Sequence, residues 1–176
     1  MLKMRRRSLI SLSLIGMIII ADQLTKILVV RYIGISEQIR FIPYFLNLTH
    51  TENKGASFGL FTDQRWVFMS LSVVAILLLG FLLFKYGDRS LLFCTGISMI
   101  LGGGMGNMID RVFRPGGVVD FFEFDFINFA IFNVADMFIT AGTFLFLIYL
   151  IFLERKSIIK RREITADENT ENGTAG

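Results

Sequence analysis

Asp120 and Asp136 are the two side chains of this sequence best suited to acid–base chemistry. Both lie in the stretch 107–136, NMIDRVFRPGGVVDFFEFDFINFAIFNVAD, which has long apolar segments on either side. A carboxylate close to the apolar part of a membrane is costly, so it indicates a functional site. Two carboxylates held together resist ionising together, and one of them then keeps its proton near neutral pH. Such a pair could hydrolyse a bond without a metal ion, because one member activates water and the other protonates the substrate.

The same two residues also have a structural interpretation. Asp120 could be an ordinary loop carboxylate, and Asp136 could cap a helix, because the helix dipole favours a negative charge at its start. A catalytic pair requires, in addition, that the loop brings Asp120 to Asp136. The spacing of the two residues along the chain does not decide between these interpretations.

Asn107, Asp110 and Arg111 are spaced three and four residues apart, so a helix would place them on one face. They could form a structural cluster in which Arg111 pairs with Asp110 at the membrane edge. Alternatively, they could orient the carboxylates or hold a lipid headgroup or a substrate carbonyl. We favour the structural role for Asp110, whereas both roles stay open for Asn107 and Arg111.

A second pair of charges, Asp22 and Lys26, lies inside the first apolar segment. Four residues apart on a helix, the two side chains can pair, a contact worth about 0.2–0.5 kcal/mol in water. We favour this pairing over a direct chemical role, and a supporting role behind the pocket stays open. Gly102 and Gly106 have the G-x-x-x-G spacing, which predicts close packing of their helix against another.

The elements that must position these residues are four membrane-spanning helices. The chain is 53% hydrophobic, above the 45–50% or so of a typical soluble domain. The apolar residues concentrate in four segments, at about residues 9–30, 66–84, 91–109 and 134–153, each close to the 20 or so residues that cross a bilayer. We therefore expect an integral membrane α-helical fold. Residues 1–162 would form one domain, with outer loops at 31–65 and 110–133 and a disordered tail at 163–176.

The first outer loop is predicted to form a small β-sheet on the membrane surface. Residues 40–42 and 45–51 have strand-like composition, Asn53-Lys54-Gly55 is a turn signal, and residues 57–61 could form a return strand. In the second outer loop, five phenylalanines could lie at the membrane interface: Phe121, Phe122, Phe124, Phe126 and Phe129. His50 is expected on the surface of a strand.

The distribution of basic residues predicts the orientation of the chain. Eleven Lys and Arg lie at 3–7, 85–89 and 155–162, on one side of the membrane, whereas six lie on the other side. The positive-inside rule then places both termini in the cytoplasm. Residues 3–30 resemble a secretory signal peptide, but Ile19 is large where the cleavage pattern needs a small residue, so we expect a retained first span. In this arrangement Asn107, Asp110, Asn133 and Asp136 gather at the outer interface.

The composition argues against several classes of site. A single cysteine, Cys94, forms no internal disulfide and no multi-cysteine metal site, and a single histidine argues against a His-rich metal centre. We expect no metal and no cofactor. The basic residues lie at membrane edges and form no stripe of the kind that binds nucleic acid.

Five ordered motifs of this sequence resemble those of the lipoprotein signal peptidase (signal peptidase II) family, the bacterial membrane aspartic proteases. The motifs are DQLTK at 22–26, NKGASF at 53–58, GNMIDR at 106–111, VVDF at 118–121 and FNVAD at 132–136. The resemblance covers all four predicted spans and leaves out only the tail after about residue 159. The RPGG turn at 114–117 is long beside shorter forms of this connection in the family.

The resemblance implies roles for the residues singled out above. Asp120 and Asp136 would be the catalytic pair. The pocket residues it implies are Asn53, Gly55, Asn107, Arg111 and Asn133. Asp22 and Lys26 would lie near the pocket.

The resemblance also implies the setting of the reaction. The substrate would be a prolipoprotein whose signal peptide ends at a diacylglyceryl-modified cysteine, cleaved on the amino side of that cysteine. The resemblance further implies a small extracytoplasmic sheet (the β-cradle), an outer-loop helix, contact with membrane phospholipids and inhibition by globomycin-type compounds. We expect a monomer in the bacterial inner membrane, with the active site near the extracytoplasmic face.

Two other classes of protein would also place acids near a membrane. A proton-coupled transporter needs ionisable groups along its whole path, whereas here they gather at one depth. A non-enzymatic factor that binds lipoproteins would bind a precursor without cleaving it. Release of a signal peptide from a lipid-modified precursor separates the protease from both.

Overall fold

The structure, a computed structural model, describes residues 2–53, 55, 65–87 and 90–154. Within these residues the chain forms four long helices, α1 (Leu2–Tyr32), α2 (Arg65–Tyr86), α3 (Leu91–Phe113) and α4 (Val134–Ile148). The last helix continues into the π-helical segment η2 (Tyr149–Glu154). All four helices are long and apolar enough to cross a membrane, so the predicted four-span α-helical fold is confirmed. The expected tail at 163–176 lies outside the described residues.

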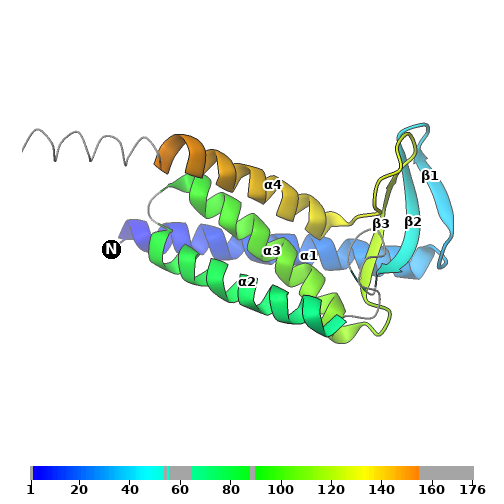
Figure 1. The fold of residues 1–176 in the computed structure, drawn as a ribbon, viewed down its shortest axis with the longest axis horizontal. Coiled ribbons are helices and arrows are strands. Elements are labelled where there is room, and N and C mark those ends of the chain that lie inside the picture. The colour runs from blue at the N-terminus through cyan, green and yellow to red at the C-terminus, as the bar shows by residue number, and fades with distance from the viewer. Residues whose placement is uncertain (1, 54, 56–64, 88–89, 155–176) are drawn as a thin grey trace, which may run out of the picture.

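Helix α3 is the centre of the bundle and packs against the other three helices (Figure 1). Glycines on α3 allow this close contact. A Cβ on Gly102 would lie 2.9 Å from the Cβ of Ile18 on α1, and one on Gly106 would lie 2.6 Å from Asp22 Oδ2. The small-residue pair of the sequence thus faces α1, as close packing requires. Toward α4, a Cβ on Gly103 would lie only 2.4 Å from the carbonyl oxygen of Ala135.

A three-stranded antiparallel sheet covers one end of the bundle (Figure 1). Its strands are β1 (Gln38–Ile42), β2 (Leu46–Asn53) and β3 (Val118–Phe124), in the order β1-β2-β3. The N-terminus and the end of η2 lie at the opposite end of the bundle.

The third strand of this sheet comes from the second outer loop. The sequence predicted a return strand at 57–61, but those residues lie outside the described part of the chain. Among the described residues, β3 pairs with β2 in a register that sets Asp120 opposite Thr51 and Val118 opposite Asn53. Residues 114–133, all of them described, contain this strand and turns but no helix. The implied outer-loop helix is therefore not in this segment, and residues 54 and 56–64 of the first loop are not described.

A buried apolar cluster joins the sheet to the bundle. Val29 and Ile33 at the end of α1 pack with Val119 and Phe121 of β3. The prediction that Phe121 lies at the membrane interface is therefore wrong, because its side chain packs into this cluster and is 2% exposed. By contrast, Phe126 and Phe129 beyond the strand are exposed, as expected for interface residues.

The prediction for His50 is also wrong. It lies on β2 but is buried, and its Nδ1 atom is 2.8 Å from the carbonyl oxygen of Ile33 at the end of α1. The sheet packs onto the helix end at this point, so the strand has no free surface there.

Candidate active site

The sheet and the start of α4 bring Asp120 and Asp136 to one site. Asp120 lies in β3, where its carbonyl oxygen accepts a hydrogen bond from Thr51 Oγ1 of β2 (3.1 Å). Asp136 lies in the first turn of α4 and belongs to a capping box with Asn133. The structural interpretation of Asp136 as a helix cap is therefore correct, and it is compatible with the paired arrangement.

Asn133 contacts both aspartates. Its side-chain Nδ2 donates to Asp120 Oδ1 at 2.6 Å, and its Oδ1 accepts from the backbone N–H of Asp136 at 3.0 Å. Its own backbone N–H donates to Asp136 Oδ2 at 3.1 Å. Asn133 is fully buried. Asn133 thus contacts both carboxylates, that of Asp120 through its side-chain amide and that of Asp136 through its backbone N–H.

The environment of Asp120 favours the protonated acid. Burial raises the pKa of this carboxyl to about 7, and repulsion from the charge of Asp136 adds to the increase. The hydrogen bonds that it accepts from Asn53 and Asn133 act in the opposite direction but do not cancel it. Near neutral pH, Asp120 is therefore close to half protonated, a state suited to donating a proton.

Asn53 and Gly55 hold Asp120 from the first outer loop. Asn53 Nδ2 donates to Asp120 Oδ2 at 3.0 Å, and the backbone N–H of Gly55 donates to Asn53 Oδ1 at 3.0 Å. The contact of Gly55 orients the amide of Asn53, so that its Nδ2 is left to face Asp120.

Asn107 is the corresponding partner of Asp136. Its Nδ2 donates to Asp136 Oδ1 at 2.8 Å, while its Oδ1 accepts from Asn133 Nδ2 at 3.0 Å. Arg111, one turn further along α3, donates to the Asn107 carbonyl oxygen at 3.3 Å. The charge of Arg111 is attracted by Asp136 and Asp120, so it adds positive potential beside the pair.

Behind this site lies a cluster of buried charges centred on Lys26. The predicted pair with Asp22 is present, with Nζ 2.9 Å from Asp22 Oδ2. The same nitrogen is 2.8 Å from Asp110 Oδ2 on α3 and donates to Asn107 Oδ1 at 2.9 Å. The side chains of Lys26, Asp22 and Asp110 are 0% exposed. At the rim, Arg114 Nε lies 3.0 Å from Asp110 Oδ1.

The structure brings together all ten residues predicted for the site. It adds Gln23, whose Nε2 donates to Asp22, to Asp110 and to the carbonyl oxygen of Gly106. The sequence contained one signal for it, the position of Gln23 directly after a buried acid in an apolar helix. Among the described residues, no three His, Cys, Asp or Glu side chains are arranged to hold a metal ion.

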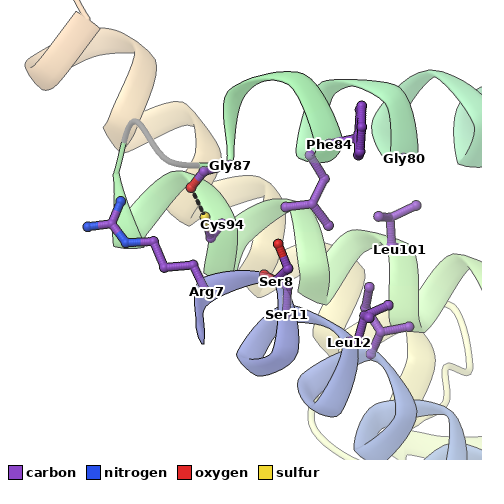
Figure 2. Close-up of a pocket in the computed structure, with 11 residues that line it drawn as sticks. Arg7, Ser8, Ser11, Leu12, Gly80, Phe84, Gly87, Cys94 and Leu101 are labelled. Atoms are coloured by element: carbon purple, nitrogen blue, oxygen red, sulfur yellow. Dashed lines mark hydrogen bonds between the residues drawn. The ribbon is translucent and has the colours of Figure 1, made fainter. Parts of the chain in front are cut away.

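A cavity of about 290 Å³ lies elsewhere, among α1, α2 and α3. Figure 2 shows Arg7, Ser8 and Ser11 of α1 beside Phe84 of α2 and Cys94 of α3. The thiol of Cys94 is buried there and donates to the Gly87 carbonyl oxygen. None of the described residues that line this cavity is an acid, so it is unsuited to acid–base hydrolysis.

Comparison with known proteins gives a consistent result. A family model described as signal peptidase (SPase) II matches residues 14–152. The lipoprotein signal peptidase of Streptococcus pneumoniae is 38% identical over 148 residues, which cover 84% of this chain and 95% of that protein. The lipoprotein signal peptidase of Enterococcus faecalis is 42% identical over 147 residues, covering 84% of this chain and 88% of the relative. A solved bacterial membrane enzyme matches with a TM-score of 0.76 and 32% identity, over 80% of this chain and 87% of its own.

Proposed function

We propose a mechanism for this chain as a member of the signal peptidase II family, to which it belongs. The protein is a multi-pass membrane aspartic protease that removes signal peptides from prolipoproteins. In this proposal Asp120 and Asp136 are the catalytic pair. The observation that carries the assignment is the bridge formed by Asn133, which contacts both carboxylates. The transporter and the non-enzymatic binding factor are not favoured by the family membership.

The proposed reaction uses the two aspartates in different protonation states. Asp120 begins as the acid, because burial and the charge of Asp136 raise its pKa to about 7. Asp136 is the carboxylate of the pair when Asp120 carries the proton, and it accepts hydrogen bonds from Asn107 and Asn133. The pair titrates as a coupled unit, so these are the roles of the reactive microstate.

Hydrolysis then proceeds by acid–base catalysis. Asp136 takes a proton from a water molecule as the water oxygen attacks the scissile carbonyl carbon, and Asp120 donates its proton to the carbonyl oxygen. When the tetrahedral intermediate collapses, the carbon–nitrogen bond breaks and Asp136 gives its proton to the departing amine. Asp120 recovers its proton from the hydroxyl group that becomes the new carbonyl. Both side chains return to their starting states.

The proposed substrate is a prolipoprotein with a diacylglyceryl-modified cysteine, cleaved on the amino side of that cysteine. The site lies beside the sheet, at the end of the bundle away from the N-terminus (Figure 1). Acyl chains would lie between helices in the bilayer, while the scissile bond reaches the interface. The positive charge of Arg111 would attract the polar part of the substrate. Globomycin-type inhibitors would compete for the same space.

The proposed orientation follows from the basic residues and the fold. Both termini would lie in the cytoplasm, and the sheet and the active site would lie at the extracytoplasmic face of the inner membrane. Residues 1–162 would act as one domain and as a monomer.

Release of the signal peptide tests the proposal. Purified protein in detergent or vesicles is mixed with a diacylglyceryl-modified precursor, and cleavage is followed at matched protein levels. Asp120→Asn and Asp136→Asn should each abolish nearly all release while substrate binding persists. Cys94→Ser is the control, because that thiol lies outside the site, and it should cleave normally. Near-normal release by either aspartate variant would remove that residue from the pair.

A further inference from the structure

We infer that Asp22, Lys26 and Asp110 act together as a positioning unit, which fixes the two aspartates of the catalytic pair through the protein backbone. This inference rests on the proposed function, because it assigns the unit to the alignment of Asp120 and Asp136. It goes beyond pairing of buried charges, which is the role that the sequence predicted for Asp22 and Lys26.

Each carboxylate of the unit holds the residue that directly precedes a catalytic aspartate. Asp22 Oδ1 accepts from the backbone N–H of Ala135 at 3.0 Å, next to Asp136. Asp110 Oδ2 accepts from the backbone N–H of Val119 at 3.2 Å, next to Asp120. Both contacts join a carboxylate to a backbone N–H. The first runs from α1 to α4, and the second runs from α3 to β3.

The contact of Asp22 supplies a hydrogen-bond acceptor at the start of α4. The first N–H groups of a helix have no partner within the helix. The Asn133 side chain satisfies the N–H of Asp136, and Asp22 on α1 satisfies that of Ala135. The first turn of α4, which carries Asp136, is therefore attached to α1.

In the same way, the contact of Asp110 holds the backbone of β3. This strand lies at the edge of the sheet, and Asp110 on α3 takes the Val119 N–H. The strand that carries Asp120 is therefore attached to α3 in addition to its pairing with β2.

Lys26 connects the two attachments. Its Nζ lies 2.9 Å from Asp22 and 2.8 Å from Asp110, and its third contact is with Asn107 Oδ1. An ammonium group has three donors, and all three are directed by this arrangement. Because Lys26 occupies Asn107 Oδ1, the Nδ2 of that amide is left to donate to Asp136.

Stability alone is a weak explanation for such a cluster. Removing charges from water is costly, and a buried ion pair is often no more stabilising than apolar residues of the same volume. Alignment of two reacting carboxylates is a different benefit, because a misplacement of about 1 Å can lower a rate by about 10²-fold. The contacts at both Val119 and Ala135 fit alignment, whereas charge neutralisation requires neither.

The decisive test removes the two backbone donors one at a time. Replacing Val119 or Ala135 with the corresponding α-hydroxy acid turns the amide into an ester, which deletes the N–H and keeps every side chain. We expect each ester to lower kcat by about 10²-fold while KM for the lipid-modified precursor changes little. The control is the ester at Met137, whose N–H donates to Asn133 O at 3.3 Å without contacting the unit, and it should keep most of kcat.

A side-chain series gives an independent test. Asp22→Asn keeps an oxygen for the Ala135 N–H, whereas Asp22→Ala does not, so the asparagine variant should retain the higher kcat per folded enzyme. The control is Cys94→Ser, whose buried thiol lies outside the site and the unit, and it should leave kcat unchanged.

The outcomes separate the two proposals. Normal kcat in both esters, together with an inactive Asp120→Asn variant, would overturn the positioning unit and leave the catalytic pair in place. Equal kcat for Asp22→Asn and Asp22→Ala would also count against the unit. Activity in Asp120→Asn would instead overturn the catalytic pair itself.

Discussion

Replacing Asp120 with asparagine should inactivate the enzyme and, above neutral pH, stabilise its folded state. The Asp120 carboxyl has an ordinary pKa of 3.8 in the unfolded chain and a pKa of about 7 in the folded protein, mainly because of burial. One pKa unit corresponds to about 1.4 kcal/mol. Ionising Asp120 in the folded protein therefore costs about 4 kcal/mol of stability above pH 7.

The sign of the effect follows from proton binding. Below pH 3.8 the carboxyl is protonated in both states, and the favourable environment of the acid contributes fully to stability. As the pH rises from 3.8 to about 7, the unfolded chain loses the proton while the folded protein keeps it, so stability declines. Above a pH of about 7 the carboxyl is ionised in both states, and its contribution to stability is fully lost. Asparagine has no proton to lose, so the variant does not show this decline.

Replacing Asp120 with asparagine also lowers stability in one respect. The carboxyl of Asp120 accepts from Asn53 and from Asn133, one on each oxygen. Asparagine has a single oxygen, so one buried donor loses its partner, at a cost of about 1–3 kcal/mol. The variant should therefore be less stable than the wild type near pH 4, and more stable by about 1–3 kcal/mol near pH 8.

Thermal unfolding in detergent micelles over this pH range measures the difference. The matched control is Asp125→Asn, which makes the same chemical change at an exposed position of the same loop and should run parallel to the wild type. If the unfolding temperature of Asp120→Asn also changes with pH in the same way as that of the wild type, then Asp120 is not buried as an acid. The assignment of Asp120 as the proton donor would then be refuted.

Four further predictions concern activity and topology. The rate constant kcat/KM should fall as the pH rises through about 7, because Asp120 must be protonated; a flat profile there would argue for another acid. Asn133→Ala should lower the unfolding temperature through loss of the α4 cap, worth about 1 kcal/mol, and should reduce release by at least about 10² because both aspartates lose a contact. An unlipidated precursor should be a very poor substrate, since each buried CH₂ contributes about 0.8 kcal/mol; equal turnover of both precursors would contradict the proposed site. Reporters fused after Lys160 should be active in the cytoplasm and those fused within 36–62 outside, and an external C-terminus would overturn the topology.

Local patterns in the sequence predicted much of the helical part. Helical spacing alone placed Asp22 beside Lys26, and the structure has that pair at 2.9 Å. The four apolar segments also predicted the four helices, because length and hydrophobicity are properties of each segment by itself. The pairing of Asp120 with Asp136 was different, since spacing left it open and only the family resemblance favoured it.

Contacts between distant segments were not predictable in the same way. The pairing of β2 with β3 joins two outer loops, and no local pattern shows which segments will pair. The burial of His50 against the end of α1 depends on that same packing. The backbone contacts at Val119 and Ala135 involve donors that every residue except proline possesses, so the sequence carries no specific signal for them.

The buried position of Lys26 has a consequence for biogenesis. Its partner Asn107 lies 81 residues later in the chain, which corresponds to about 4–16 s of synthesis at 5–20 residues per second. During that interval α1 can enter the bilayer only as it stands. Asp22, one turn away, balances the charge of Lys26, so the apolar part of the helix at 8–30 carries no net charge. We expect Asp22→Asn, which leaves Lys26 uncompensated during that time, to increase quality-control degradation of the nascent protein before α3 is inserted.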